Sequence, residues 1–181
     1  MLKNSQDRYG VVSRALHWLM ALLLIALFAV GWYITEISYY NPWYKLSFDL
    51  HKSFGMVALL LGILRIGWII YNPAPALPET MEPWAQLAAK GGHYALYLMM
   101  LLIPVSGYLI STADGQGIIV FDLFEVPALL PPVKGMEDLA GWAHYLLAFG
   151  TAWLVLAHMI AALKHQYVDR DGTLDKMLGG D

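Results

Sequence analysis

Four long apolar stretches most constrain how this chain folds. They run over residues 12–34, 50–71, 92–110 and 139–163. A helix needs roughly 20 apolar residues to cross a hydrocarbon core about 30 Å thick, and each stretch is about that long. Hydrophobic residues make up 59% of the 181 residues and charged residues only 14%, too few to cover a soluble domain. The sequence therefore predicts an all-α integral membrane protein, a four-helix bundle that forms one domain over residues 1–181.

The first stretch is interrupted by His17 and lacks a small-residue cleavage site. We therefore expect it to remain as a helix rather than to be removed as a signal peptide. Between the third and fourth stretches, residues 111–138 contain several Gly and Pro residues and predict a structured loop. This loop is long for a simple connection, which indicates a docking surface.

Lys and Arg residues predict the orientation in the membrane. If both chain ends lie inside, the inner side carries eight of them and the outer side three. The inner group is Lys3, Arg8, Arg14, Arg65, Lys90, Lys164, Arg170 and Lys176, and the outer group is Lys45, Lys52 and Lys134. Because cytoplasmic loops are enriched in Lys and Arg, both termini are predicted to be cytoplasmic.

Net charge and cysteine content exclude several classes of function. The formal net charge is −3, and no basic stripe is present to bind phosphates, so nucleic acid is not an expected partner. There is no cysteine, which excludes disulfides, thiolate zinc sites, iron–sulfur clusters and covalently attached c-type haem.

Five of the six histidines fall into two layers inside the predicted helices. His51 and His144 lie near the outer ends, whereas the inner layer contains His17, His93 and His158. His144 and His158 are fourteen residues apart, which is about 21 Å along a helix and close to the same helical face. One helix therefore presents two imidazoles to the bundle interior at two depths.

Neutral imidazole is a good ligand for haem iron, and two layers predict two b-type haems. If a haem lies in the outer layer, its ligands must be His51 and His144. The inner layer has three candidate histidines for two ligand positions, and the spacing does not choose between them. Two haems at two depths form a path for electrons across the membrane.

Further residues share these depths. Gly31 lies fourteen residues after His17 and lets the backbone approach a porphyrin, and Gly55 lies on the His51 face of the second helix. Gly55 serves either haem packing or contact between helices. Arg65, fourteen residues after His51, is a candidate for a propionate. Arg14 is either a second propionate ligand or an anchor at the membrane surface, and we favour the anchor.

Several short motifs occur in an order that resembles the prokaryotic cytochrome b561 family, which is related to the cytochrome b subunits of membrane hydrogenases and formate dehydrogenases. The similarity covers nearly the whole chain. The motifs are Arg8-Tyr9-Gly10, His17-Trp18-Leu19, His51-Lys52-Ser53-Phe54-Gly55, Gly92-His93-Tyr94, Pro104-Val105-Ser106-Gly107, Ile110-Ser111-Thr112-Ala113-Asp114-Gly115, His144, His158 and Ala162-Leu163-Lys164-His165.

The resemblance implies that one haem b is bound by His51 and His144 and the other by His17 and His158. His93 then either supports a ligand or belongs to a quinone site. It also implies a multi-pass protein of the bacterial inner membrane that carries respiratory electrons.

The family further implies that the membrane partner is a quinone, such as ubiquinone. Gly92, His93 and His165 are the candidate quinone residues. A periplasmic redox or binding protein is a candidate partner on the other side.

Some family members oxidise superoxide at the outer face, and whether this chain is itself a quinone-linked oxidoreductase is left open. Its outer surface has a net charge of −4, because three lysines face seven acids. The acids are Glu36, Asp49, Asp114, Asp122, Glu125, Glu137 and Asp138. Such a surface repels an anion, so we rank an electron carrier above a superoxide oxidase.

A third hypothesis is a metal-ion transporter that uses the intramembrane histidines. Transporters usually pair such histidines with carboxylates near the membrane midplane, and the four helices have essentially none there. We therefore rank this hypothesis last.

Overall fold

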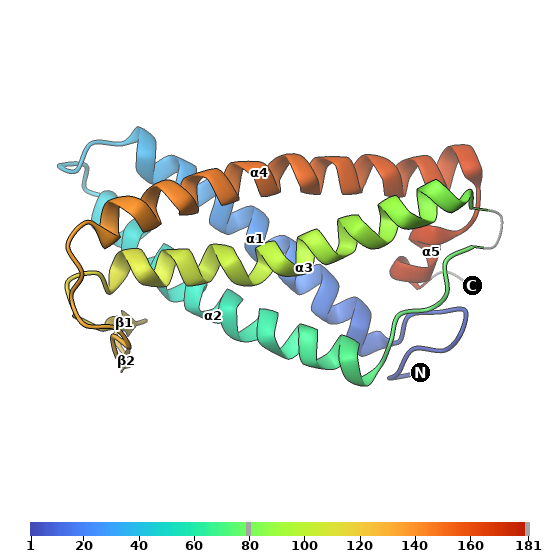
Figure 1. Cartoon of the computed structure of the whole chain (residues 1–181), viewed down its shortest axis with the longest axis horizontal. Helices are drawn as coiled ribbons and strands as arrows, with labels where there is room; N and C mark the ends of the chain where they lie inside the picture. Colours follow the sequence, from blue (N-terminus) through green and yellow to red (C-terminus); the bar gives the residue numbers. More distant parts are fainter. Residues whose placement is uncertain (79–80, 180–181) are drawn as a thin grey trace.

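The computed structural model describes residues 1–78 and 81–179, and four long helices form its bundle (Figure 1). They are α1 (Val11–Glu36), α2 (Tyr44–Tyr71), α3 (Pro83–Ser111) and α4 (Met136–Lys164). Each contains one predicted stretch and extends beyond it. All four are long and apolar enough to cross a membrane. The chain is therefore a multi-pass membrane protein.

The helices pack in sequence order around the bundle. Helix α1 packs against α2, α2 against α3, and α3 against α4. Aromatic side chains join α1 to α4, where the ring centres of Phe28 and Phe149 are 5.4 Å apart. Both chain ends lie at one end of the bundle, which we call the termini end, and a small β-hairpin lies at the opposite, hairpin end (Figure 1).

Large apolar side chains cover the outside of the bundle. Leu22, Ile70 and Trp153 are between 68% and 77% exposed, whereas Met20 and Ala58 in the interior are almost fully buried. In a bilayer the exposed groups contact lipid, so they need no protein partner.

The structured loop predicted between α3 and α4 contains strands β1 (Ile118–Val120) and β2 (Phe124–Val126), which pair antiparallel. The turn is fixed to α2, because the backbone N–H of Phe121 donates to Ser53 Oγ at 3.0 Å. Tyr108 of α3 holds the following segment, since its hydroxyl donates to the Pro127 carbonyl and accepts from the Leu129 N–H. The hairpin is therefore attached to both helices beneath it.

At the termini end, α4 continues into the π-helical turn η1 (His165–Asp169), and a short helix α5 (Thr173–Leu178) follows. Trp18 of α1 donates from its indole nitrogen to the carbonyl of Met177 at 3.3 Å. This contact holds the C-terminal segment against the start of α1.

Candidate functional site

Two histidines face each other at the hairpin end. His51 of α2 and His144 of α4 have ring centres 6.2 Å apart, with ring planes at 80°. Two imidazoles that bind one iron from opposite sides, each at about 2 Å, have ring centres about 6.3 Å apart. In the part of the chain that the structure describes, no hydrogen bond joins the two rings. Their spacing therefore suits a metal ion between them better than a direct contact.

The orientation of His144 is set by α3. Its Nδ1 lies 3.0 Å from the Ile103 carbonyl oxygen and 3.0 Å from Ser106 Oγ. A carbonyl oxygen only accepts, so Nδ1 carries the proton and donates it. The Nε2 atom then keeps a free lone pair, which is the state in which a neutral imidazole binds iron.

Two glycines make room for these rings. A Cβ atom at Gly31 would lie 3.0 Å from His51 Cε1, and one at Gly107 would lie 3.2 Å from His144 Cε1. The His51 ring is buried, with the Leu27 backbone close enough to accept a hydrogen bond from it. Two imidazoles that face each other, each with space at its ring edge, form a donor set that fits a haem iron site.

Three histidines meet at the termini end. The ring centres of His17 and His158 are 6.3 Å apart, and those of His93 and His158 are 5.5 Å apart. The first distance matches the spacing of two axial imidazoles, and it nearly equals the distance in the hairpin-end pair. His158 therefore has two neighbours, of which His17 has the spacing of an iron partner.

Arg65 lies beside this cluster, at the depth that its spacing from His51 predicts. Its Nη2 contacts His17 Nδ1 at 3.0 Å, and its Nη1 donates to the Leu16 carbonyl at 3.2 Å. The guanidinium also lies over the Tyr97 ring, 5.8 Å from its centre. Because arginine only donates, His17 accepts at Nδ1 here.

The other residues predicted for the site lie in other surroundings. A Cβ atom at Gly55 or at Gly92 would meet no atom within 4 Å. Arg14 lies at the bundle surface, where its guanidinium packs against Gly179. His165 is paired with acids of the C-terminal segment.

His165 Nδ1 lies 2.8 Å from a carboxylate oxygen of Asp171 and 3.0 Å from one of Asp169. Burial raises the pKa of Asp171, but hydrogen bonds from Thr173 and the His165 ring outweigh it, so the pKa lies below its ordinary value. These contacts fix the turn after α4.

Ser106, Gly107, Ile103 and Tyr97 are site residues that sequence reasoning did not single out. All four belong to α3 and contact the histidines or Arg65 from there. Ser106 and Gly107 do fall in a motif that carries the family resemblance, which was the available signal.

Comparisons with known proteins match nearly the whole chain. The family described as prokaryotic cytochrome b561 matches residues 8–180. The chain is 43% identical to cytochrome b561 homolog 2 of Escherichia coli, over 97% of this chain and 94% of that protein. It is 30% identical to the probable superoxide oxidase CybB of Yersinia pestis, over 94% and 96% respectively.

Proposed function

Because the chain belongs to the prokaryotic cytochrome b561 family and is a membrane cytochrome b, we propose that it binds two haem b groups and carries electrons across the membrane. The electrons pass between the quinone pool and a periplasmic donor or acceptor. We propose that residues 1–181 form one domain in the bacterial inner membrane, with both termini in the cytoplasm.

We base this proposal on two histidine pairs, which have nearly the same spacing at opposite ends of the bundle. Ring centres are 6.2 Å apart for His51 and His144 and 6.3 Å apart for His17 and His158. We assign these four residues as the ligands that would hold the two haem irons. A haem held by two histidines would supply one-electron transfer without binding oxygen.

The chain's own residues tune each site. Ile103 and Ser106 hold His144 with its proton on Nδ1. At the other end, a neutral His17 that binds iron through Nε2 must also carry its proton on Nδ1. Arg65 would then give up its contact with Nδ1, and its donors would be available to a haem propionate, as the sequence analysis expects.

His93 is left as a neighbour of the termini-end site rather than a ligand. It lies against His158 and its ring stacks near Tyr97, with centres 6.5 Å apart. A quinone that exchanges electrons with the haem needs a hydrogen-bond donor for its carbonyl close to the iron. We favour His93 as that donor. Gly92 is the adjacent residue in α3, and its surroundings leave space beside the backbone.

Haem content per chain tests the proposal. The purified protein should contain two haem b groups, measured from the reduced-minus-oxidised spectrum and a chain concentration. His144→Ala should lose one haem and keep the other, and His17→Ala should lose only the other one. His93→Ala is the matched control and should keep both. A colourless protein, or His93→Ala with one haem, contradicts the assignment.

A second candidate function is superoxide oxidation with quinone as acceptor, which the similarity to a probable superoxide oxidase favours. The hairpin end carries charge that opposes it. A cavity of about 210 Å³ there is lined by Lys52 together with Asp114 and Glu137. Lys52 also lies 3.3 Å from a carboxylate oxygen of Asp49. Acids therefore outnumber the lysine, and an anionic substrate is repelled.

Rapid mixing of the oxidised protein with superoxide separates the two functions. An electron carrier that does not use superoxide should show haem reduction no faster than a heat-denatured sample. Fast reduction that disappears in Lys52→Gln would establish superoxide as the donor and displace a periplasmic protein from that role.

A further inference from the structure

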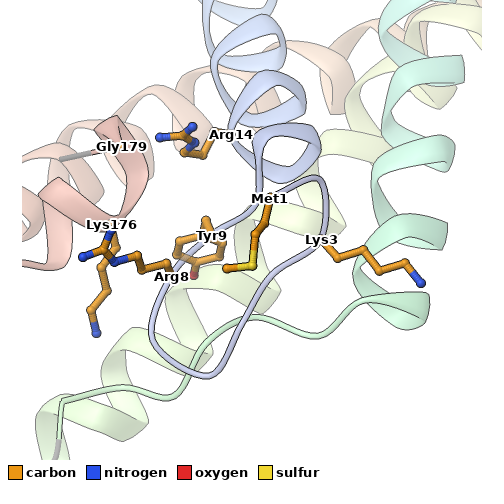
Figure 2. A pocket seen from close by; sticks show the side chains of 7 residues that line it. All are labelled: Met1, Lys3, Arg8, Tyr9, Arg14, Lys176 and Gly179. Carbon is orange, nitrogen blue, oxygen red and sulfur yellow. The ribbon is translucent and has the colours of Figure 1, made fainter. Parts of the chain in front are cut away.

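A cavity of about 280 Å³ lies at the termini end, where residues from both ends of the chain and from α1 line it (Figure 2). Its cations are partly engaged, because Lys3 donates to the Tyr71 hydroxyl at 2.6 Å and Arg8 also has an interaction partner. The lining therefore does not by itself indicate a ligand. A buried polar group that lacks a partner lies elsewhere, in the middle of the bundle.

Thr151 of α4 carries a buried hydroxyl that makes no hydrogen bond to any residue that the structure describes. It lies seven residues after His144 and seven before His158, about 10.5 Å along the helix from each. Seven residues are close to two helical turns, so Thr151 shares the face of α4 that presents both histidines. A helical threonine can donate to a carbonyl one turn earlier, and Thr151 does not. A hydroxyl without an acceptor is costly inside a membrane bundle, so it indicates a ligand.

The Met100 carbonyl of α3 lacks its usual helical donor. Pro104 lies inside α3 and has no N–H, so it cannot donate to the carbonyl four residues before it, which is that of Met100. Met100 is only 5% exposed, so bulk water does not replace the missing donor. Gly62 of α2 lies beside this oxygen, since a Cβ atom there would stand 3.4 Å from it, and Gly62 has no side chain to cover the carbonyl. The carbonyl therefore remains available as an acceptor.

The hydroxyl and the carbonyl lie at the same level of the bundle. Helices α3 and α4 run antiparallel side by side (Figure 1) and contact each other through their histidines at two levels. His93 lies against His158, with ring centres 5.5 Å apart, and at the other level α3 holds His144 Nδ1 at 3.0 Å. Met100 is seven residues beyond His93 on the same face of α3, and Thr151 is midway between the two histidines of α4. Both groups therefore lie between these two contacts, on the faces that α3 and α4 turn toward each other.

We infer that a single water molecule bridges the Thr151 hydroxyl and the Met100 carbonyl in the middle of the bundle. The hydroxyl donates to the water oxygen and the water donates to the carbonyl, so one molecule satisfies both groups. Both groups are neutral, which suits water rather than an ion. The site lies between the two histidine layers, on the path that we propose for electrons. Its place on that path rests on the proposed function, whereas the water site itself depends only on the two helices.

X-ray radiolytic labelling of the full-length holoprotein, with mass spectrometry of each methionine, tests this site, because radicals formed from a bound water oxidise the side chain beside it. In the wild-type protein Met100 should be oxidised well above Met20, which is also buried, at 2% exposed. Thr151→Val removes the hydroxyl at nearly constant shape, and the oxidation of Met100 should fall to the level of Met20. Thr151→Ser keeps a hydroxyl and should keep the oxidation. Thr112→Val is the matched control and should also keep it, since the Thr112 hydroxyl already donates to the Tyr108 carbonyl.

Pro104→Ala tests the other partner of the water. An alanine N–H can donate to the Met100 carbonyl, so it should displace the water and lower the oxidation of Met100 in the same way. The inference is overturned if Met100 in the wild-type protein is oxidised no faster than Met20. It is also overturned if the oxidation of Met100 persists in Thr151→Val or in Pro104→Ala.

The b-type spectrum of the same samples separates this inference from the proposed function. A wild-type protein without haem contradicts the proposed function and leaves the oxidation of Met100 as a measure of the water. Loss of haem in Thr151→Val with haem retained in Thr151→Ser would make the hydroxyl a haem contact, and the water would then be excluded.

Discussion

At the scale of single residues, glycine and histidine act together at the hairpin end. Gly31 and Gly107 come from different helices, yet each lies against the Cε1 edge of one imidazole. A methyl group at either position must push its ring by a few tenths of an ångström, because the Cβ would stand closer to it than ordinary van der Waals contact. Glycine is needed at these two positions because an imidazole lies close to the backbone, not because the backbone adopts a conformation that only glycine allows.

Gly31→Ala and Gly107→Ala should therefore weaken haem binding at the hairpin end, on the order of tenfold, as is usual when the support of a metal ligand is disturbed. Gly67→Ala in α2 is the control, since a Cβ there meets no atom within 4 Å. Haem titration of the apoprotein measures the effect. Unchanged affinity in both variants would mean that the rings do not bind iron in these positions.

Arg65 places a positive charge beside His17, and a nearby cation stabilises reduced iron over oxidised iron. Arg65→Gln should lower the midpoint potential of the termini-end haem by tens of millivolts, on the order expected for one partly screened charge. The hairpin-end haem is the internal control, because Arg65 contacts neither of its ligands. A redox titration that shifts both haems equally would contradict a local effect.

The histidine layers could be predicted from spacing because each helix fixes the depth and face of its own residues. His144 and His158 illustrate this, since their separation alone places them at two depths. The contacts of α3 could not be predicted in the same way. Whether Ser106 and Gly107 touch His144 depends on how α3 is rotated against α4, and that rotation is decided by packing between helices.

At the scale of elements, the apolar stretches predicted all four helices but not their full lengths. Helix α2 begins at Tyr44 and α3 at Pro83, six and nine residues before the predicted starts at residues 50 and 92. The first turns of α2 and α3 contain more polar residues than a membrane-spanning segment. A prediction from hydropathy alone therefore leaves these turns out of the helices. Pro83 is well suited to a helix start, because its missing N–H would have no partner there.

A chain of hydrogen bonds ties the N-terminal segment to α1 and α2. Trp68 of α2 donates to Ser13 Oγ at 2.8 Å, and Ser13 donates to Asn4 Oδ1 at 2.7 Å. Asn4 in turn donates to the carbonyls of Asn72 and Pro73 at the end of α2. The Asn4 side chain therefore accepts a hydrogen bond from α1 and donates two to the end of α2.

Asn4→Ala should lower stability by about 1–3 kcal/mol, because it leaves partly buried polar groups without partners. Asn4→Asp should be intermediate, since a carboxylate still accepts from Ser13 but cannot donate to the two carbonyls. Gln6→Ala, at an exposed position, is the control. Thermal unfolding in detergent, followed by the haem spectrum, measures the order, and equal midpoints for all three would refute the role of Asn4.

For the whole molecule, charge is distributed unevenly between the two ends. The termini end has the larger share of Lys and Arg, and at the hairpin end Asp49 pairs with both Lys45 and Lys52. At the termini end Lys164 pairs with Asp169 in the same way, so pairing does not distinguish the two ends. The count of Lys and Arg therefore favours a cytoplasmic termini end, because acidic residues contribute little to membrane orientation.

Single-cysteine labelling tests this orientation cleanly, because the chain has no cysteine of its own. Leu123 in the hairpin and Val168 after α4 are 80% and 72% exposed, so Leu123→Cys and Val168→Cys should disturb little packing. A membrane-impermeant maleimide should label Leu123→Cys in intact spheroplasts and Val168→Cys only after the membrane is disrupted. The opposite pattern would put the His51–His144 pair on the cytoplasmic side and reverse the direction in which the two sites are connected, while leaving the spacing within each pair unaffected.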